Sequence, residues 1–168
     1  MKMMNGAHML RMTDITYLEE LLITEDGTLN VLPYHKLKDI PQSAISQFCV
    51  QHGYYLIPTV ELVFFIKEEI GQSPAIEIGS GSGTLCKALG IVGTDNYMQM
   101  WADVKEAYES AHQKPISYGA HVQRIAARDA IRKYRPDVIV AAWVTRRLPP
   151  LRSKRRLFFY LLSRCMFL

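Results

Sequence analysis

Short apolar runs alternate with segments of helical periodicity through the second half of the chain. The run 75–78 (AIEI) lies between Pro74 and a glycine, which is typical of a buried strand in a parallel sheet. Further strands are predicted over 91–94, 121–126 and 137–144, and helical patterns over 84–90, 101–111 and 127–134 separate them. This alternation of strands and helices predicts an α/β fold with a doubly wound parallel sheet.

The first half of the chain predicts helices only. Apolar positions recur at helical spacing over 15–22, after a capping Asp14, and again over 42–52 and 59–70. We therefore expect an N-terminal helical cap over 13–73, followed by an α/β core over 74–145 within one domain overall. In 101–111 the apolar positions Trp101, Val104, Tyr108 and Ala111 predict an amphipathic helix that covers the sheet with its aromatic side chains in the core.

Three alternating glycines follow the first predicted strand, in the sequence EIGSGSG from Glu77 to Gly83. A backbone that leaves a strand and turns sharply needs positive φ or the absence of Cβ, and glycine provides both. The next predicted strand ends at Asp95, whose carboxylate can accept hydrogen bonds from both hydroxyls of a ribose. Strand, glycine loop, helix, strand and acid together predict a nucleoside ligand across the strand ends.

This segment resembles motif I of the class I S-adenosylmethionine-dependent methyltransferases, an acid followed by an apolar residue and G-x-G-x-G. The resemblance covers about residues 54–145 and implies a Rossmann-like fold that binds S-adenosyl-L-methionine. The cofactor-binding residues that it implies are Glu77, Gly79, Ser80, Gly81, Gly83, Asp95 and Asn96. In that family the glycine loop passes the amino-acid part of the cofactor, and the acid after the second strand holds the ribose.

Three other interpretations of the glycine loop stay open. Such loops also occur as plain tight turns, and a non-catalytic module could hold the cofactor or a nucleotide without a substrate site. An NAD-binding Rossmann domain is less favoured, because Thr84 replaces the last glycine of G-x-G-x-x-G. Glu77 also suits the ammonium of a methionine moiety better than it suits a pyrophosphate.

The substrate is not predicted. Residues 142–145 (AWVT) lack the N/D-P-P-[YF] motif of many amino-group methyltransferases, and Trp143 could wall the pocket or fill the core. No catalytic residue is assigned. Tyr54, Tyr55 and Thr59 are candidate neighbours of the cofactor by analogy, although aromatic packing at a helix junction explains them equally well.

Charge and cysteine usage bear on the partners and the cellular location of the protein. Residues 1–145 hold 13 Lys and Arg and all 16 Asp and Glu, a net charge of −3, so this body gives no indication of nucleic-acid binding. Three scattered cysteines, with no cluster at metal-ligand spacing, predict reduced thiols, a cytoplasmic location and no metal site. No segment is apolar enough to predict a membrane span. Residues 1–12 contain GAHM, which resembles a cloning remnant, and we expect them to be a disordered segment outside the fold.

The last 23 residues (146–168) form an atypical tail with seven basic residues and no acid. Within the tail, 157–162 could form one more strand. A complete class I domain needs roughly 60–90 more residues after its fourth strand. We therefore expect the second half of the sheet to be incomplete. Three explanations of the tail stay open. It could result from a shifted or truncated reading frame, or form a basic amphipathic element for membrane or nucleic acid. It could also provide an edge strand that pairs with a second copy in a homo-oligomer.

Overall fold

The computed structural model of the protein describes residues 14–25, 27–142 and 156–159. The expectations for residues 1–12, for 143–145 and for most of the basic tail lie outside the described residues. The two possible roles of Trp143 and the expected disorder of residues 1–12 therefore stay predictions.

The core of the fold is a parallel sheet with the strand order β3-β2-β1-β4-β5, and every neighbouring pair is parallel. The strands are β1 (Ala75–Ile78), β2 (Val92–Asp95), β3 (Gln123–Arg124), β4 (Val138–Ala141) and β5 (Arg156–Phe159). In the central register, Ile76 of β1 lies opposite Val92 on one side and Ile139 on the other. The predicted doubly wound parallel sheet is confirmed, and β5 begins one residue before the strand expected in the tail.

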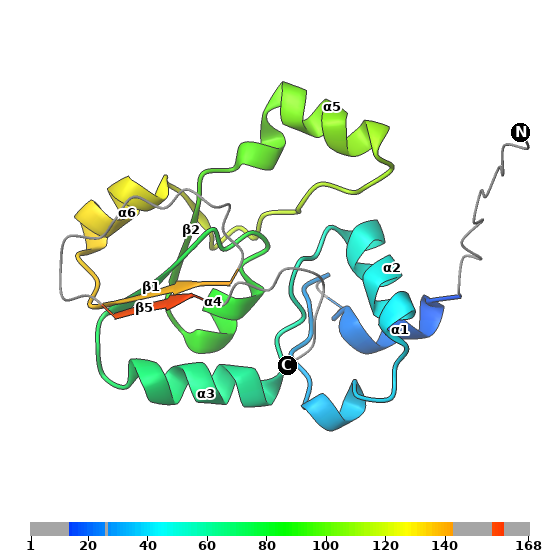
Figure 1. Ribbon diagram of the computed structural model, residues 1–168, viewed down its shortest axis with the longest axis horizontal. Helices are drawn as coiled ribbons and strands as arrows, with labels where there is room; N and C mark the ends of the chain where they lie inside the picture. Colours follow the sequence, from blue (N-terminus) through cyan, green and yellow to red (C-terminus); the bar gives the residue numbers. More distant parts are fainter. Residues whose placement is uncertain (1–13, 26, 143–155, 160–168) are drawn as a thin grey trace, which may run out of the picture.

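Helices cover both faces of this sheet (Figure 1). α3 (Val60–Ile70) and α4 (Thr84–Leu89) pack on one face, whereas α6 (Ala127–Tyr134) packs on the other. Alternation along β4 explains the two layers, because Val138 and Val140 join the cluster with α3 and α4 while Ile139 joins the cluster with α6. By the same alternation, the side chain of Glu77 in β1 lies on the α4 side.

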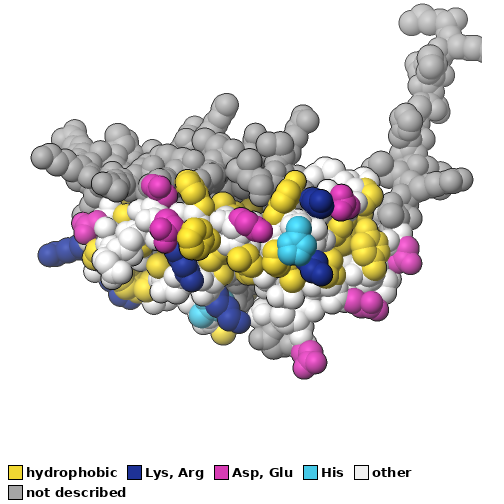
Figure 2. Space-filling model, turned by 90° about the horizontal axis from the view of Figure 1, so that it is seen from below, with side chains coloured by type: hydrophobic (Ala, Val, Ile, Leu, Met, Phe, Trp, Pro, Cys, Tyr) yellow, Lys and Arg dark blue, Asp and Glu magenta, His cyan; other side chains and the backbone are white. Residues whose placement is uncertain are grey.

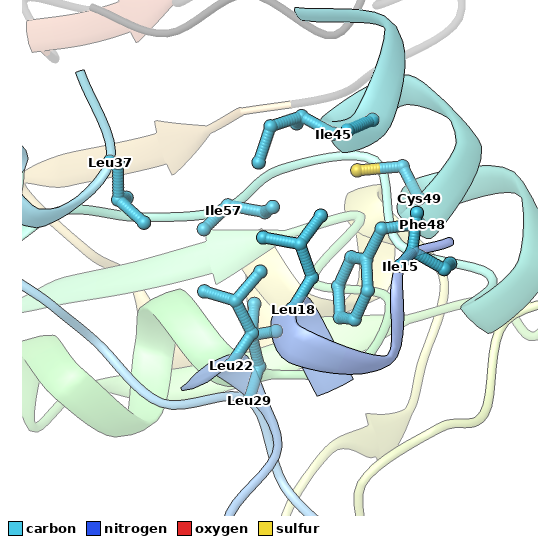
Figure 3. Packing of buried hydrophobic residues seen from close by; sticks show 10 residues of the cluster. Ile15, Leu18, Leu22, Leu29, Leu37, Ile45, Phe48, Cys49 and Ile57 are labelled. Carbon is cyan, nitrogen blue, oxygen red and sulfur yellow. The ribbon is translucent and has the colours of Figure 1, made fainter. Parts of the chain in front are cut away.

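The N-terminal helices form their own apolar cluster beside the sheet (Figure 3). They are α1 (Thr16–Leu22), the 3-10 helix η1 (Tyr34–Lys36) and α2 (Gln42–His52). The N-cap residue of α1 is Ile15 rather than the predicted Asp14, whose carboxylate accepts a hydrogen bond from the Thr16 N–H at 3.0 Å one position earlier. The fully buried Leu18, Leu22 and Phe48 tie α1 to α2. The chain therefore enters the sheet from a separately packed helical unit.

The connection from β2 to β3 departs from the expectation. It contains the 3-10 helix η2 (Met98–Met100) and α5 (Ala102–Ser110), and no residue of either is buried. Trp101 is 48% exposed, so the prediction of a covering helix with core aromatics is wrong. Figure 1 shows α5 standing away from the sheet. An amphipathic pattern identifies an apolar face but not the element that contacts it, which is why the sequence misled here. The third strand is also shorter than predicted, at two residues.

Candidate functional site

A cavity of about 310 Å³ lies at the carboxyl ends of β1 and β2. This is the position at which open parallel sheets bind ligands. Its walls come from the loop before α3, the glycine loop, the end of β2 and the β2–β3 connection. The lining residues used below are Tyr54, Tyr55, Glu77, Gly79, Ser80, Gly81, Asp95, Asn96, Gln99, Tyr108, Ile116 and Tyr118. Six of the seven residues implied by the resemblance thus lie in one wall, and Gly83 does not.

Gly83 has a structural place instead. It caps α4 with φ of 78°, and a Cβ there would lie 2.4 Å from both the His121 ring and the Val122 side chain. Its carbonyl oxygen lies 3.0 Å from His121 Nε2. His121 therefore supports the base of the glycine loop rather than facing the cavity. Gly81 does face it, and its left-handed φ of 53° favours glycine there; a Cβ would lie 3.1 Å from Cδ1 of Ile116, a tight contact.

Glu77 is the most unusual residue of the site. Its side chain is 2% exposed, and Oε2 has no hydrogen-bond partner among the described residues. Burial raises the pKa of Glu77 from 4.5 to about 8, hydrogen bonding with Ser80 and Cys86 opposes that rise, and the nearby Asp95 charge adds to it. The carboxyl group is therefore mostly protonated at neutral pH. A cation placed against Oε2 would favour its ionised form.

Asp95 is held rigidly at the end of β2. One carboxylate oxygen accepts the Gly81 N–H at 3.1 Å, and the other accepts the Tyr97 N–H at 2.8 Å. Each oxygen keeps a further lone pair for a ligand donor. The neighbouring Asn96 turns its Oδ1 to the Met98 N–H at 3.0 Å. The loop thus presents an oriented carboxylate beside the glycines.

Ser80 fastens the glycine loop to β2. Its hydroxyl accepts the Thr94 N–H at 2.9 Å and donates to the Glu77 carbonyl oxygen at 3.2 Å. The buried Thr94 hydroxyl donates to the same carbonyl at 3.0 Å. These bonds fix the separation between the Glu77 and Asp95 backbones, so the site is organised without a ligand.

The opposite wall was not predicted as a unit. Tyr54 and Tyr55 line the cavity, whereas Thr59 is buried and caps α3 by accepting the Leu62 N–H at 3.2 Å. The Tyr55 hydroxyl is hydrogen-bonded to the Tyr108 hydroxyl. Burial raises the pKa of Tyr55, and the bond to Tyr108 raises it further. This hydroxyl is therefore uncharged at physiological pH.

Gln99 and Tyr118 complete that wall. The Gln99 amide nitrogen donates to the Tyr55 hydroxyl at 3.1 Å, and the Gln99 N–H lies 3.4 Å from the Tyr118 hydroxyl. Burial raises the pKa of Tyr118 to about 12, with the Asp95 charge as a further cause. No short motif indicates these residues, because they lie in a connection whose path depends on long-range packing.

The carboxyl groups and basic side chains around the cavity are unequally represented. Among its described lining residues the carboxyl groups belong to Glu77 and Asp95, and none is Lys, Arg or His. Such a wall favours a cationic or neutral ligand over a pyrophosphate, which needs positive partners. Asp129, in α6 after β3, is not one of the lining residues. Its carboxylate is exposed, and its Oδ1 lies 3.6 Å from Nη1 of Arg132.

The outer surface gives no stronger indication. On the face in Figure 2, hydrophobic, acidic and basic side chains of the described residues are intermixed, without the uniform basic area typical of nucleic-acid binding. No group of three or more His, Cys, Asp or Glu among the described residues could hold a metal ion. Within the same residues, no helix is long and apolar enough to cross a bilayer.

The comparisons with known proteins add no family. No protein-family model, no curated protein and no solved structure matches the chain. The interpretation of the site therefore depends on its own geometry and chemistry.

Proposed function

We propose that this pocket binds S-adenosyl-L-methionine and that the protein is a methyltransferase whose methyl acceptor is unknown. The observation that carries the proposal is the combination of two carboxyl groups, no lining cation and an unpartnered Oε2 of Glu77 among the described residues. A sulfonium nucleoside with an ammonium group fits this wall better than NAD does.

Each residue has a distinct role in the proposal. Asp95 would accept hydrogen bonds from the ribose hydroxyls, and Glu77 would accept from the ammonium group. Gly79 and Gly81 leave room for the ligand beside the loop, while Ser80 and Asn96 keep the loop and the β2 end in place. The bound cofactor would supply the methyl group. The contribution of the chain is then positioning, which converts a bimolecular transfer into one within a complex.

Calorimetry with S-adenosylmethionine, S-adenosylhomocysteine and NAD tests the proposal. We expect heat of binding with the first two and none with NAD. Binding of NAD alone would refute the methyltransferase proposal in favour of a dinucleotide-binding Rossmann domain.

A second candidate function is a non-catalytic module that binds the cofactor without transferring its methyl group. The uncharged tyrosine wall favours it, because phenols whose pKa lies as high as that of Tyr118 are donors rather than general bases at neutral pH. Incubation with methyl-labelled cofactor and pools of protein, RNA and small-molecule acceptors separates the two. Label transfer supports the enzyme, and tight binding without transfer supports the module.

We also propose a cytoplasmic location, because the three cysteines are scattered along the sequence without a C-x-x-C pair. Homo-oligomer formation is testable by sedimentation of the full chain.

A further inference from the structure

The β2–β3 connection passes over the pocket instead of packing on the sheet. The Cδ1 atom of Ile116 lies 3.1 Å from the position of a Cβ on Gly81, so its side chain rests on the glycine loop. Tyr118, two residues on, lines the cavity beside it. This connection therefore roofs the cavity in the structure.

The roof is attached to the N-terminal unit through a small polar contact, which we call the latch: Gln99, Tyr55 and Tyr108. Gln99 donates to the Tyr55 hydroxyl at 3.1 Å and accepts the Ile116 N–H at 2.8 Å, while Tyr55 bonds Tyr108 of α5. The Gln99 side chain thus joins the β2–β3 connection to the N-terminal unit and holds Ile116, the residue that rests on Gly81. A further backbone bond, from the Lys114 N–H to a carbonyl of α2, is long at 3.3 Å.

The backbone of Lys114 and Pro115 also packs closely on Gly53, where an added Cβ would lie 2.6 Å from the Pro115 carbonyl oxygen, whereas the part of the connection around α5 is weakly held. No residue of α5 is buried, and Met100 and Trp101 are 61% and 48% exposed. Two non-glycine residues with left-handed φ, Tyr97 (59°) and His112 (54°), stand at the start of the connection and just after α5. Segments with few buried contacts open at lower free energy than core strands.

The two ends of the connection, at Tyr97 and Tyr118, are anchored more firmly. The Tyr97 and Tyr118 rings stack with centroids 3.9 Å apart and planes 8° apart, and the Tyr97 hydroxyl donates to the Val122 carbonyl at 2.7 Å. Motion of the connection is thereby confined to the residues between Tyr97 and Tyr118.

We propose that residues 98–117 form a lid over the pocket, held closed by the latch, and that the lid opens as a unit to admit the ligand. The lid concerns the same pocket as the proposed function and serves any ligand there. Gln99 is a positioning residue for the lid, because its side chain bonds Tyr55 and Ile116.

Hydrogen exchange of the ligand-free full chain tests the lid without reference to any cofactor. We expect the Ile116 and Lys114 amides to exchange well before the amides of β1 and β4. Gln99→Ala should accelerate exchange at Ile116 about tenfold through loss of its acceptor and of the Tyr55 contact, and leave β1 unchanged. Gln113→Ala, an exposed residue of the same connection, is the matched control and should change neither.

Two results would overturn the lid. One is wild-type exchange at Ile116 as slow as that of β1; the other is an effect of Gln99→Ala that spreads equally over β1 and β4, which marks general destabilisation. A kinetic measurement complements this test, with S-adenosylhomocysteine as probe and tryptophan fluorescence as readout. Gln99→Ala should raise both the association and the dissociation rate constants several-fold, whereas Gln113→Ala should change neither. If S-adenosylhomocysteine does not bind at all, the proposed function fails, and exchange alone still decides the lid.

Discussion

Replacing Glu77 by glutamine should change how the stability of the protein depends on pH. The carboxyl group is buried, and burial raises its pKa from 4.5 to about 8. Between these values the unfolded chain releases the proton while the folded chain keeps it. Stability of the wild type therefore falls as pH rises from about 4.5, and this loss levels off above about 8. An amide side chain cannot ionise, so Glu77→Gln lacks this component.

The size of the effect follows from the two pKa values. For one group that titrates at 4.5 unfolded and about 8 folded, the destabilisation accumulated by pH 7 is roughly 3 kcal/mol. The free energy of unfolding of Glu77→Gln relative to the wild type should therefore rise by about that amount between pH 4 and pH 7. This difference is independent of any constant penalty for the buried amide.

Urea unfolding at a series of pH values from about 4 to about 9 measures the effect. Glu69→Gln, which removes an exposed carboxyl group on α3, is the control and should leave the pH profile parallel to that of the wild type. Parallel profiles for Glu77→Gln and the wild type would mean that Glu77 titrates normally in the folded protein, contrary to this prediction.

Four effects of ligand and backbone substitutions follow from the same geometry. An ammonium group that binds at Glu77 requires the carboxyl group to ionise. Binding of S-adenosylmethionine at pH 7 should therefore release close to one proton in the wild type and fewer in Glu77→Gln. Calorimetry in buffers of different ionisation enthalpy measures the number of protons released. For the same reason, affinity should strengthen as pH rises towards 8, and a flat affinity profile would count against the assignment. Asp95→Ala should weaken cofactor binding by roughly 1–3 kcal/mol through lost ribose hydrogen bonds, whereas the exposed Asp103→Ala should not; equal calorimetric affinities would show that Asp95 is misassigned. Gly83→Ala should lower the free energy of unfolding by roughly 2–4 kcal/mol, because left-handed strain adds to the clash with His121. Gly27→Ala, with φ of 74° and open space around it, should lower it by only about 1 kcal/mol. Similar urea midpoints for the two variants would show that the clash at Gly83 does not destabilise the protein.

The sheet and its flanking helices could be predicted because their signals are local. The predicted helix 127–134 coincides with α6, and 42–52 coincides with α2, since periodic apolar positions and a stop residue mark each end. The run 75–78 coincides with β1 for a similar reason, with Pro74 before it and a glycine after it. At these positions local propensity and tertiary packing agree.

The other wall of the pocket could not be predicted, because it depends on contacts between distant segments. Tyr55 and Tyr108 are 53 positions apart and meet only because the β2–β3 connection turns towards the N-terminal unit. The local sequence around each tyrosine carries no trace of that contact. The motif around Glu77 also did not predict its burial. It indicates a carboxyl group near the glycine loop, but not that burial keeps this group mostly protonated.

Amide chemical-shift mapping with S-adenosylmethionine tests the central claim most directly, because it reports where the ligand binds as well as whether it binds. We expect large shifts at Gly79, Ser80, Gly81, Asp95 and Asn96, and none in the outer turns of α3. Absence of shifts at saturating ligand, or shifts gathered away from the carboxyl ends of β1 and β2, would contradict the claim.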